Sequence, residues 1–293
     1  MADITAFLFP GQGRVPDALP PHADMVEPLL RTAEAHGLPL RRWILEGAAE
    51  RLERTDAMQP ALFIDSIARN ATLRAAGWAP DIVAGHSLGE YAALVSAGVL
   101  TAEAALAVVI ERGRLMSDVD GAMAAILKLD LATVEHLCDD VGDGVCIANH
   151  NSPAQIVVSG EADAVVKLAK QAAEAGGRAI PLKVSGPFHS PQMAPAERAL
   201  EPALRRLRSA PAAIPVVSAR SGEILREPDR LIEAMTHQIT SPVRWVRVIE
   251  TLESFGVTRA VEVGSGDVLC GLGRRTTDAI RFMTHEEALD ERV

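Results

Sequence analysis

The chain carries a serine in a setting that activates nucleophiles. Ser87 is the middle residue of Gly85-His86-Ser87-Leu88-Gly89, which follows a short apolar run and precedes a helical pattern. A GxSxG between a strand and a helix is typical of a sharp turn that exposes the serine hydroxyl. The amides of the following helix point at the same place, so the Leu88 amide is positioned to donate to an oxyanion. The pattern predicts acyl transfer or hydrolysis through an acyl-serine, and its alternative is an ordinary small-residue turn.

A serine is a weak nucleophile at its own pKa and needs a base. Of the eight histidines, His189 follows Gly186-Pro187-Phe188 near the end of an inserted segment, where a loop reaches over the sheet that carries Ser87. His86 is next to Ser87, but neighbours at a turn do not normally face each other. His189 is therefore the candidate base, and a structural histidine at a domain junction is its alternative.

The elements around these residues alternate between strands and helices. Apolar runs over 4–9 and 81–84 predict strands, and helical patterning covers 24–35, 60–76 and 90–97. Thr101 is expected to cap a further helix. Strand followed by helix, repeated, predicts a parallel sheet with helices on its faces.

A second unit is inserted into this alternation. Its predicted strands and helices follow the order βαββαβ, which is the ferredoxin-like pattern. They cover 122–129, 131–141, 145–148, 155–159, 162–175 and 178–184, with Asn149 to Pro153 as a connection. Helices over 194–207, 229–238 and 243–255 and strands over 214–218 and 259–263 then resume the first unit. We expect an α/β fold: an α/β-hydrolase-like large unit, residues 1–122 and 190–293, with an inserted ferredoxin-like small unit, residues 123–189. The active site is expected in the cleft between them.

Composition excludes several classes of protein. Hydrophobic residues make up 48% and charged residues 23%, as in soluble globular chains. The net charge of −10 and an aromatic content of 3% argue against a nucleic-acid binder. The three cysteines lack metal-ligand spacing, and neither a signal peptide nor a membrane span is predicted. We expect a cytoplasmic protein with no bound cofactor, metal or membrane partner.

Nine short motifs, in this order along nearly the whole chain, are together highly specific although no single one is. They are Phe9 to Gly13, Gln59 to Leu62, Gly85 to Tyr91, Glu111 to Gly113, Gly121 to Ala125, Asn149 to Pro153, Phe188 to Ser190, Ser241 to Trp245 and Glu262 to Gly264. With them the chain resembles the malonyl-CoA:acyl carrier protein transacylases, the discrete acyltransferases of fatty-acid and polyketide synthesis.

The resemblance implies a ping-pong acyl transfer. Ser87 attacks the thioester of malonyl-CoA with His189 as general base, and the thiol of an acyl carrier protein then takes the acyl group. The Gln12 and Leu88 amides form the oxyanion hole, and a backbone carbonyl at Gln238 orients the histidine. Coenzyme A is then a substrate, present as its thioester.

The resemblance also implies substrate-binding residues. Arg112 pairs with the free carboxylate of malonyl, because a guanidinium binds a carboxylate through two parallel hydrogen bonds. The alternative for Arg112 is a surface ion pair with Glu111 or Asp118. Phe188 crowds an α-methyl branch and so favours malonyl. Gln59 and Asn151 lie near the pocket, unless they serve only as turn and helix-cap residues.

The sequence departs from the family pattern beside the expected oxyanion loop, at Arg14 and Val15, and also at Pro187 and Ser265. These departures keep a second function open, the transfer of a larger acyl group between carrier proteins in a polyketide pathway. A hydrolase that clears acyl groups from carrier proteins, or a non-catalytic docking subunit, is disfavoured by Arg112 and by the intact Ser87 and His189. An ordinary esterase is disfavoured because no acidic triad member stands out between them.

Carrier proteins are acidic, so docking on a chain with a net charge of −10 requires a local basic patch. Only 4 of its 29 basic residues are lysine, so arginines must supply the patch. The candidates are Arg244, Arg247, Arg274 and Arg275, with ordinary solvated surface as the alternative.

Overall fold

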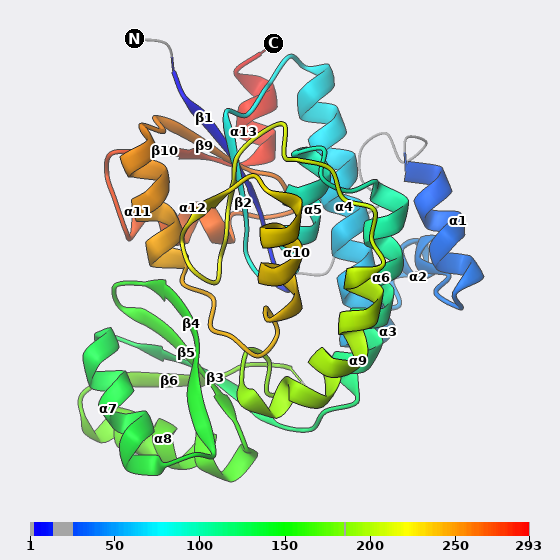
Figure 1. Cartoon of the computed structure of the whole chain (residues 1–293). Helices are drawn as coiled ribbons and strands as arrows, with labels where there is room; N and C mark the ends of the chain where they lie inside the picture. The colour runs from blue at the N-terminus through cyan, green and yellow to red at the C-terminus, as the bar shows by residue number, and fades with distance from the viewer. Residues whose placement is uncertain (1–2, 14–25, 185, 293) are drawn as a thin grey trace.

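Two sheets make up the frame of the molecule (Figure 1). The computed structural model describes residues 3–13, 26–184 and 186–292. The larger sheet has the order β10-β9-β1-β2-β7-β8, and all its neighbouring strands are parallel except β7 and β8. Its strands are β1 (Thr5–Phe9), β2 (Ile82–Gly85), β7 (Val216–Val217), β8 (Ile224–Leu225), β9 (Arg259–Glu262) and β10 (Arg281–Met283).

The two faces of the larger sheet carry separate cores. Alternate residues of a strand point to opposite faces, so Phe7 and Phe9 pack under α1, α4, α5 and α6, whereas Ala6 and Leu8 pack against α11 and α12. The helices lie on both sides of the sheet (Figure 1). They are α1 (Glu27–Ala35), α2 (Leu40–Leu45), α3 (Ala49–Leu52), α4 (Thr55–Ala75), α5 (Gly89–Ser96), α6 (Ala102–Ser117), α9 (Ala194–Arg205), α10 (Pro228–Thr236), α11 (Trp245–Phe255), α12 (Val268–Arg274) and α13 (His285–Asp290).

The smaller sheet is fully antiparallel and has the order β4-β5-β3-β6. Numbered within this unit, the order is second, third, first, fourth, which is the ferredoxin-like arrangement, so that prediction is confirmed. Helices α7 and α8 pack on one face around Ile126, Val134, Ile156 and Leu168. The elements are β3 (Ala122–Leu127), α7 (Leu131–Val141), β4 (Val145–Ser152), β5 (Gln155–Gly160), α8 (Ala162–Glu174) and β6 (Arg178–Pro181). The boundaries at 122/123 and 189/190 stay a prediction.

Several element bounds differ from those expected from the sequence. Residues 149–152 are not a connection but the second half of β4, because they pair with β5. Helix α4 begins at Thr55 rather than Pro60, and the proline lies inside it. Helix α1 begins at Glu27, and the expected start at Asp24 lies outside the described residues, as do Arg14 and Val15. No helix in the described part of the chain is both long and apolar enough to cross a bilayer.

Backbone pairing joins the smaller sheet to the larger unit at the cleft. Val243, just before α11, donates its amide to the Ala148 carbonyl and accepts from the His150 amide. Asn149 and Val243 thereby form a parallel bridge. This pairing, called the seam below, attaches β4 to the segment that leads into α11.

Candidate active site

Ser87 stands on a strained turn between β2 and α5. Its φ is +52°, a left-handed conformation that residues with a Cβ rarely adopt. The turn closes because Gly85 and Gly89 allow a very close approach: a Cβ on Gly89 would lie 2.0 Å from the Phe9 carbonyl oxygen. Strain of this kind persists where the surroundings hold a functional side chain in place. The predicted turn at GxSxG is therefore present.

His189 faces Ser87 across the cleft. Its Nε2 is 2.7 Å from Ser87 Oγ, and its Nδ1 is 3.0 Å from the carbonyl oxygens of both Gln238 and Ser241. Carbonyl oxygens only accept, so Nδ1 carries the proton and Nε2 is free to take one from the serine. Burial, followed by the nearby Arg112 charge and His86, lowers the pKa of His189 to about 3. The imidazole is therefore neutral near pH 7, as a general base must be.

Arg112 lies at the floor of the site and is 1% exposed, so the alternative of a surface ion pair is wrong. Its Nη2 donates to Ser87 Oγ at 3.1 Å and to Gln238 Oε1 at 3.0 Å, and its Nη1 donates to Gln59 Oε1 at 2.7 Å. The guanidinium also lies 5.8 Å from the centre of the Tyr91 ring. Burial lowers the pKa of Arg112, but a guanidinium stays charged at neutral pH. A fixed cation therefore stands beside the candidate nucleophile.

Gln12 and Gln59 join the same network. Gln59 Nε2 donates to Gln12 Oε1 at 3.1 Å and to Met116 Sδ at 3.5 Å. Within residues 3–13, 26–184 and 186–292, neither the Gln12 amide nor the Leu88 amide donates to a backbone carbonyl of a turn or loop. Among the described residues, both amides are thus available for an oxyanion.

A hollow of about 280 Å³ lies beside the turn, between the two sheets. Its lining is mostly apolar but includes the side-chain amides of Asn149 and Asn151 on β4 and of Gln155 on β5. Asn151 Oδ1 lies 2.9 Å from His86 Nε2, and the His86 ring packs 5.3 Å from the Trp245 ring. A second hollow of about 790 Å³ shares Gln12 with the first. The described residues therefore leave space on both sides of Gln12.

Phe188 is buried rather than exposed to either hollow. It packs in a small apolar cluster with Met116, Met123 and Ile239. Met116 in turn contacts Gln59 through its sulfur. Phe188 thus supports the wall of the site from behind, and its effect on an α-methyl branch stays a prediction.

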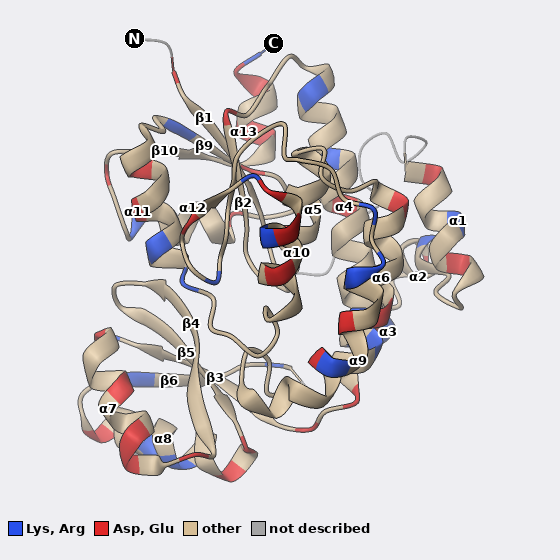
Figure 2. Cartoon of the chain, viewed as in Figure 1, with Lys and Arg blue, Asp and Glu red and all other residues tan. Residues whose placement is uncertain are grey.

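The four candidate arginines of the carrier patch do not form one group. Arg275 Nη1 reaches Gln155 Oε1 at 3.5 Å, at the rim of the hollow lined by amides, and exposed Arg244 follows the seam. Arg247 pairs with Glu250 in a separate groove, and Arg274 donates to the Phe282 carbonyl in another. Figure 2 shows basic residues on α11 and on the chain leading into it, at the end of the helix that faces the smaller sheet.

Glu90 and Ser241 belong to the site but were missed by the sequence analysis. The Ser241 carbonyl is the second acceptor of His189 Nδ1. Glu90 is 4% exposed and accepts from Gln238 Nε2 at 2.6 Å and from the Ala219 amide at 2.9 Å. The signal for Glu90 was its place in the first turn after Ser87, where an acidic residue also suits a helix N-terminus.

Two backbone carbonyls hold the far nitrogen of His189, in the place where many serine hydrolases use a carboxylate. Together with the strained serine and the two-sheet α/β fold, this defines a class of enzymes that transfer acyl groups through a serine. The chain belongs to the acyl transferase domain family, whose model matches residues 23–285.

Similar proteins agree with this assignment. The malonyl CoA-acyl carrier protein transacylase of Bacillus subtilis is 39% identical over 292 residues, which cover 94% of this chain and 91% of the relative. The structure of the Coxiella burnetii malonyl CoA-acyl carrier protein transacylase aligns with a TM-score of 0.91 at 33% identity, over 99% of this chain and 96% of that one. A malonyl-transacylase solved in complex with a type II polyketide-synthase acyl-carrier protein aligns with a TM-score of 0.90 at 33% identity, over 98% and 99% of the two chains.

Proposed function

We propose that this chain moves a malonyl group from coenzyme A to the phosphopantetheine thiol of an acyl carrier protein. The observation that carries the proposal is the buried Arg112 guanidinium, 3.1 Å from Ser87 Oγ. A three-carbon diacid held by its free carboxylate on Arg112 brings its thioester carbonyl to the serine. Acetyl has no carboxylate for this cation, so dicarboxylic acyl groups are preferred. The relatives named as malonyl transacylases support the same substrate.

In the first half-reaction His189 Nε2 takes the Ser87 hydroxyl proton as Oγ bonds to the thioester carbon. The Gln12 and Leu88 amides donate to the resulting oxyanion, and such donors are worth about 3 kcal/mol each in the transition state. The C–S bond then breaks, and the coenzyme A thiolate takes the proton from His189.

In the second half-reaction the carrier thiol gives its proton to His189 and attacks the acyl-serine ester. Collapse of the new oxyanion breaks the bond to Ser87 Oγ, which recovers the proton from His189. Neutral His189 serves both halves because Nδ1 keeps its proton and donates it in hydrogen bonds to the two carbonyl oxygens. The side-chain amides of the hollow suit the amide-bearing pantetheine arm that both substrates share.

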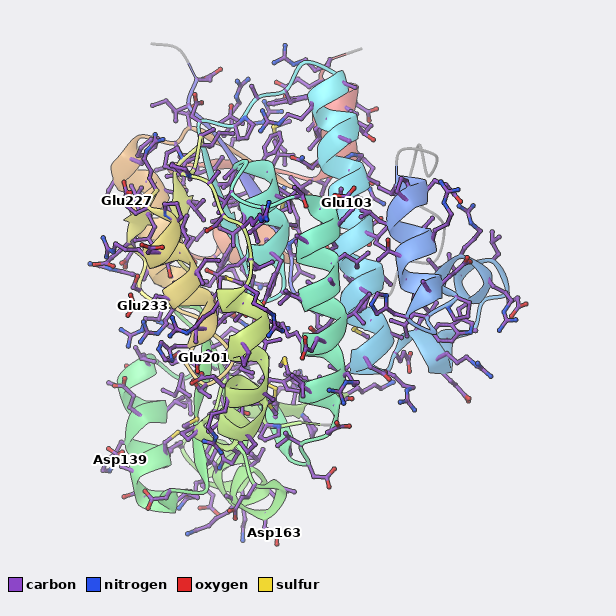
Figure 3. All side chains as sticks on the ribbon, turned by 45° about the vertical axis from the view of Figure 1, so that its right-hand side comes forward. Glu103, Asp139, Asp163, Glu201, Glu227 and Glu233 are labelled. Atoms are coloured by element: carbon purple, nitrogen blue, oxygen red, sulfur yellow. The ribbon has the colours of Figure 1, made fainter. Side chains whose placement is uncertain are left out.

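We infer that the carrier protein docks beside this hollow, on Arg244 and Arg275. Carboxylates lie on other elements: Figure 3 labels Glu103 on α6, Glu201 on α9, and Glu227 and Glu233 at α10. An acidic carrier protein is repelled there and attracted to the arginines.

A pair of charge reversals tests the docking site. Arg244→Glu with Arg275→Glu should raise the KM for the carrier at least about tenfold at low salt and leave self-acylation by malonyl-CoA unchanged. Arg247→Glu with Arg274→Glu is the matched control, with the same change in net charge. If the two double variants have equal carrier kinetics, docking occurs elsewhere.

The acyl group itself is tested by intact mass. The protein is mixed separately with malonyl-CoA, methylmalonyl-CoA and acetyl-CoA, with Ser87→Ala as the control. The expected result is a malonyl adduct that requires Ser87, with little acetyl adduct. Rapid release of free coenzyme A without an adduct would instead indicate a hydrolase. An adduct formed only from acylated carrier proteins would indicate transfer of another acyl group between carriers.

A further inference from the structure

Glu90 places a carboxylate in the site that the proposed reaction does not use. It lies in the first turn of α5, three residues after the nucleophile, and is 4% exposed. Its Oε1 accepts from the Ala219 amide and its Oε2 accepts from Gln238 Nε2. A buried carboxylate needs such partners, because an unpaired one is costly to remove from water.

The Gln238 side chain connects Glu90 to Arg112. Its Nε2 donates to Glu90 and, at 2.9 Å, to the Ser87 carbonyl, while its Oε1 accepts from Arg112 Nη2. A guanidinium only donates and an ionised carboxylate only accepts. The amide therefore fits in one orientation, with its oxygen toward Arg112 and its NH₂ toward Glu90.

We propose that Glu90 is a positioning residue for acyl-group selectivity: by fixing the Gln238 amide, it holds the Arg112 guanidinium where it meets the substrate carboxylate. This inference rests on the proposed role of Arg112. The nucleophile and its base depend less on Glu90, because His189 is held by main-chain carbonyls of Gln238 and Ser241 rather than by the Gln238 side chain.

Glu90→Gln tests this with almost no change in shape. The new side chain has one oxygen for two donors, so either the Ala219 amide or the Gln238 NH₂ faces another NH₂ group. Turning the Gln238 amide relieves the conflict at position 90 but points its NH₂ at the Arg112 guanidinium. Each arrangement displaces the guanidinium or leaves a buried donor unsatisfied.

The measurement is kcat/KM for acylation of Ser87 by malonyl-CoA and by acetyl-CoA. Glu90→Gln should lower the malonyl-to-acetyl ratio about tenfold, with the acetyl rate within about twofold of the parent. Labelling of Ser87 by a fluorophosphonate, which needs the serine and its base but no carboxylate, should be unchanged. Asp65→Asn is the matched control: Asp65 is 2% exposed and holds Arg69 and the Ser265 amide, so its loss costs stability without altering the ratio.

An unchanged ratio in Glu90→Gln, or an equal fall of the malonyl, acetyl and fluorophosphonate rates, overturns the inference and leaves Glu90 a structural residue. Gln238→Met serves if Glu90→Gln fails to fold, since it keeps the carbonyl that holds His189 and removes the amide. It should lower the ratio to a similar extent. If Arg112→Met also leaves the ratio unchanged, the proposed function itself has failed, and the two failures are thereby distinguished.

Discussion

Replacing Arg112 with methionine should convert a malonyl-selective site into one that no longer distinguishes malonyl from acetyl. Methionine keeps an unbranched side chain in the buried space and removes the guanidinium. Arg112 is also one of the causes, after burial, that lower the pKa of His189. Its removal therefore does not weaken the base, and the acetyl reaction should not slow for that reason.

The magnitude follows from the hydrogen bonds of Arg112. A carboxylate can take two charge-assisted bonds from the guanidinium, at about 1.5–3 kcal/mol each. In the free protein Nη2 already donates to Ser87 Oγ, and giving up that bond costs about 1 kcal/mol. The net preference of about 2–5 kcal/mol corresponds to roughly 30-fold to a few thousandfold in kcat/KM.

The assay compares kcat/KM for malonyl-CoA and acetyl-CoA in the parent and in Arg112→Met, well below the melting temperature of each. That temperature must be measured, because the variant leaves the Gln59 and Gln238 side-chain oxygens without their donor, at about 1–3 kcal/mol each. A ratio that changes less than about threefold refutes the role of Arg112. An equal loss of both activities would show that the residue only supports the fold.

Three further outcomes are expected. Burial raises the pKa of Glu90 to about 7, from an ordinary value near 4.5, so Glu90 gains a proton as the pH falls through 7, while neutral His189 does not. The malonyl-to-acetyl ratio should therefore fall between pH 8 and 6 in the parent but not in Glu90→Gln, and a parallel pH profile in both would contradict this. The same shift means that Glu90 favours the folded state increasingly as the pH falls from 7 towards 4.5, which chemical denaturation at several pH values would measure. Gly89→Ala should destabilise the protein by about 3 kcal/mol or more, because its Cβ meets the Phe9 carbonyl oxygen. Gly271→Ala on α12, where the nearest atom to an added Cβ is Arg275 Nη2 at 4.0 Å, is the control, and equal melting temperatures would show that the turn can relax.

Local patterns predicted the frame and the turn that carries Ser87. β1 and β2 are short apolar runs ended by glycine or proline, and α7 has the bounds expected over 131–141. The glycine spacing around Ser87 was enough to predict its turn. These features depend on neighbours in the sequence, and for that reason they could be recognised without the fold.

The parts that were missed depend on residues distant in sequence. Residues 149–152 are polar and suggested a turn, but their backbone is paired with β5 and with Val243. Glu90 is 148 positions from Gln238 in the sequence, and no local pattern indicates that the two side chains form a hydrogen bond. The resemblance indicated the main-chain role of Gln238 but not its side chain, whose partners on α5 and α6 come together only in the folded protein.

The seam also has a mechanical consequence. The short segment from Gln238 to Val243 supplies both carbonyls that hold His189 and, at its end, the pairing with β4. A hinge motion that pulled the two units apart at this point would strain the same six residues that fix the tautomer of the His189 imidazole. The cleft is therefore expected to be stiff at the seam. Any opening motion of the cleft should occur mainly on the side away from the seam. For the same reason, a chimera that exchanges the small unit should carry residues 238–243 with it.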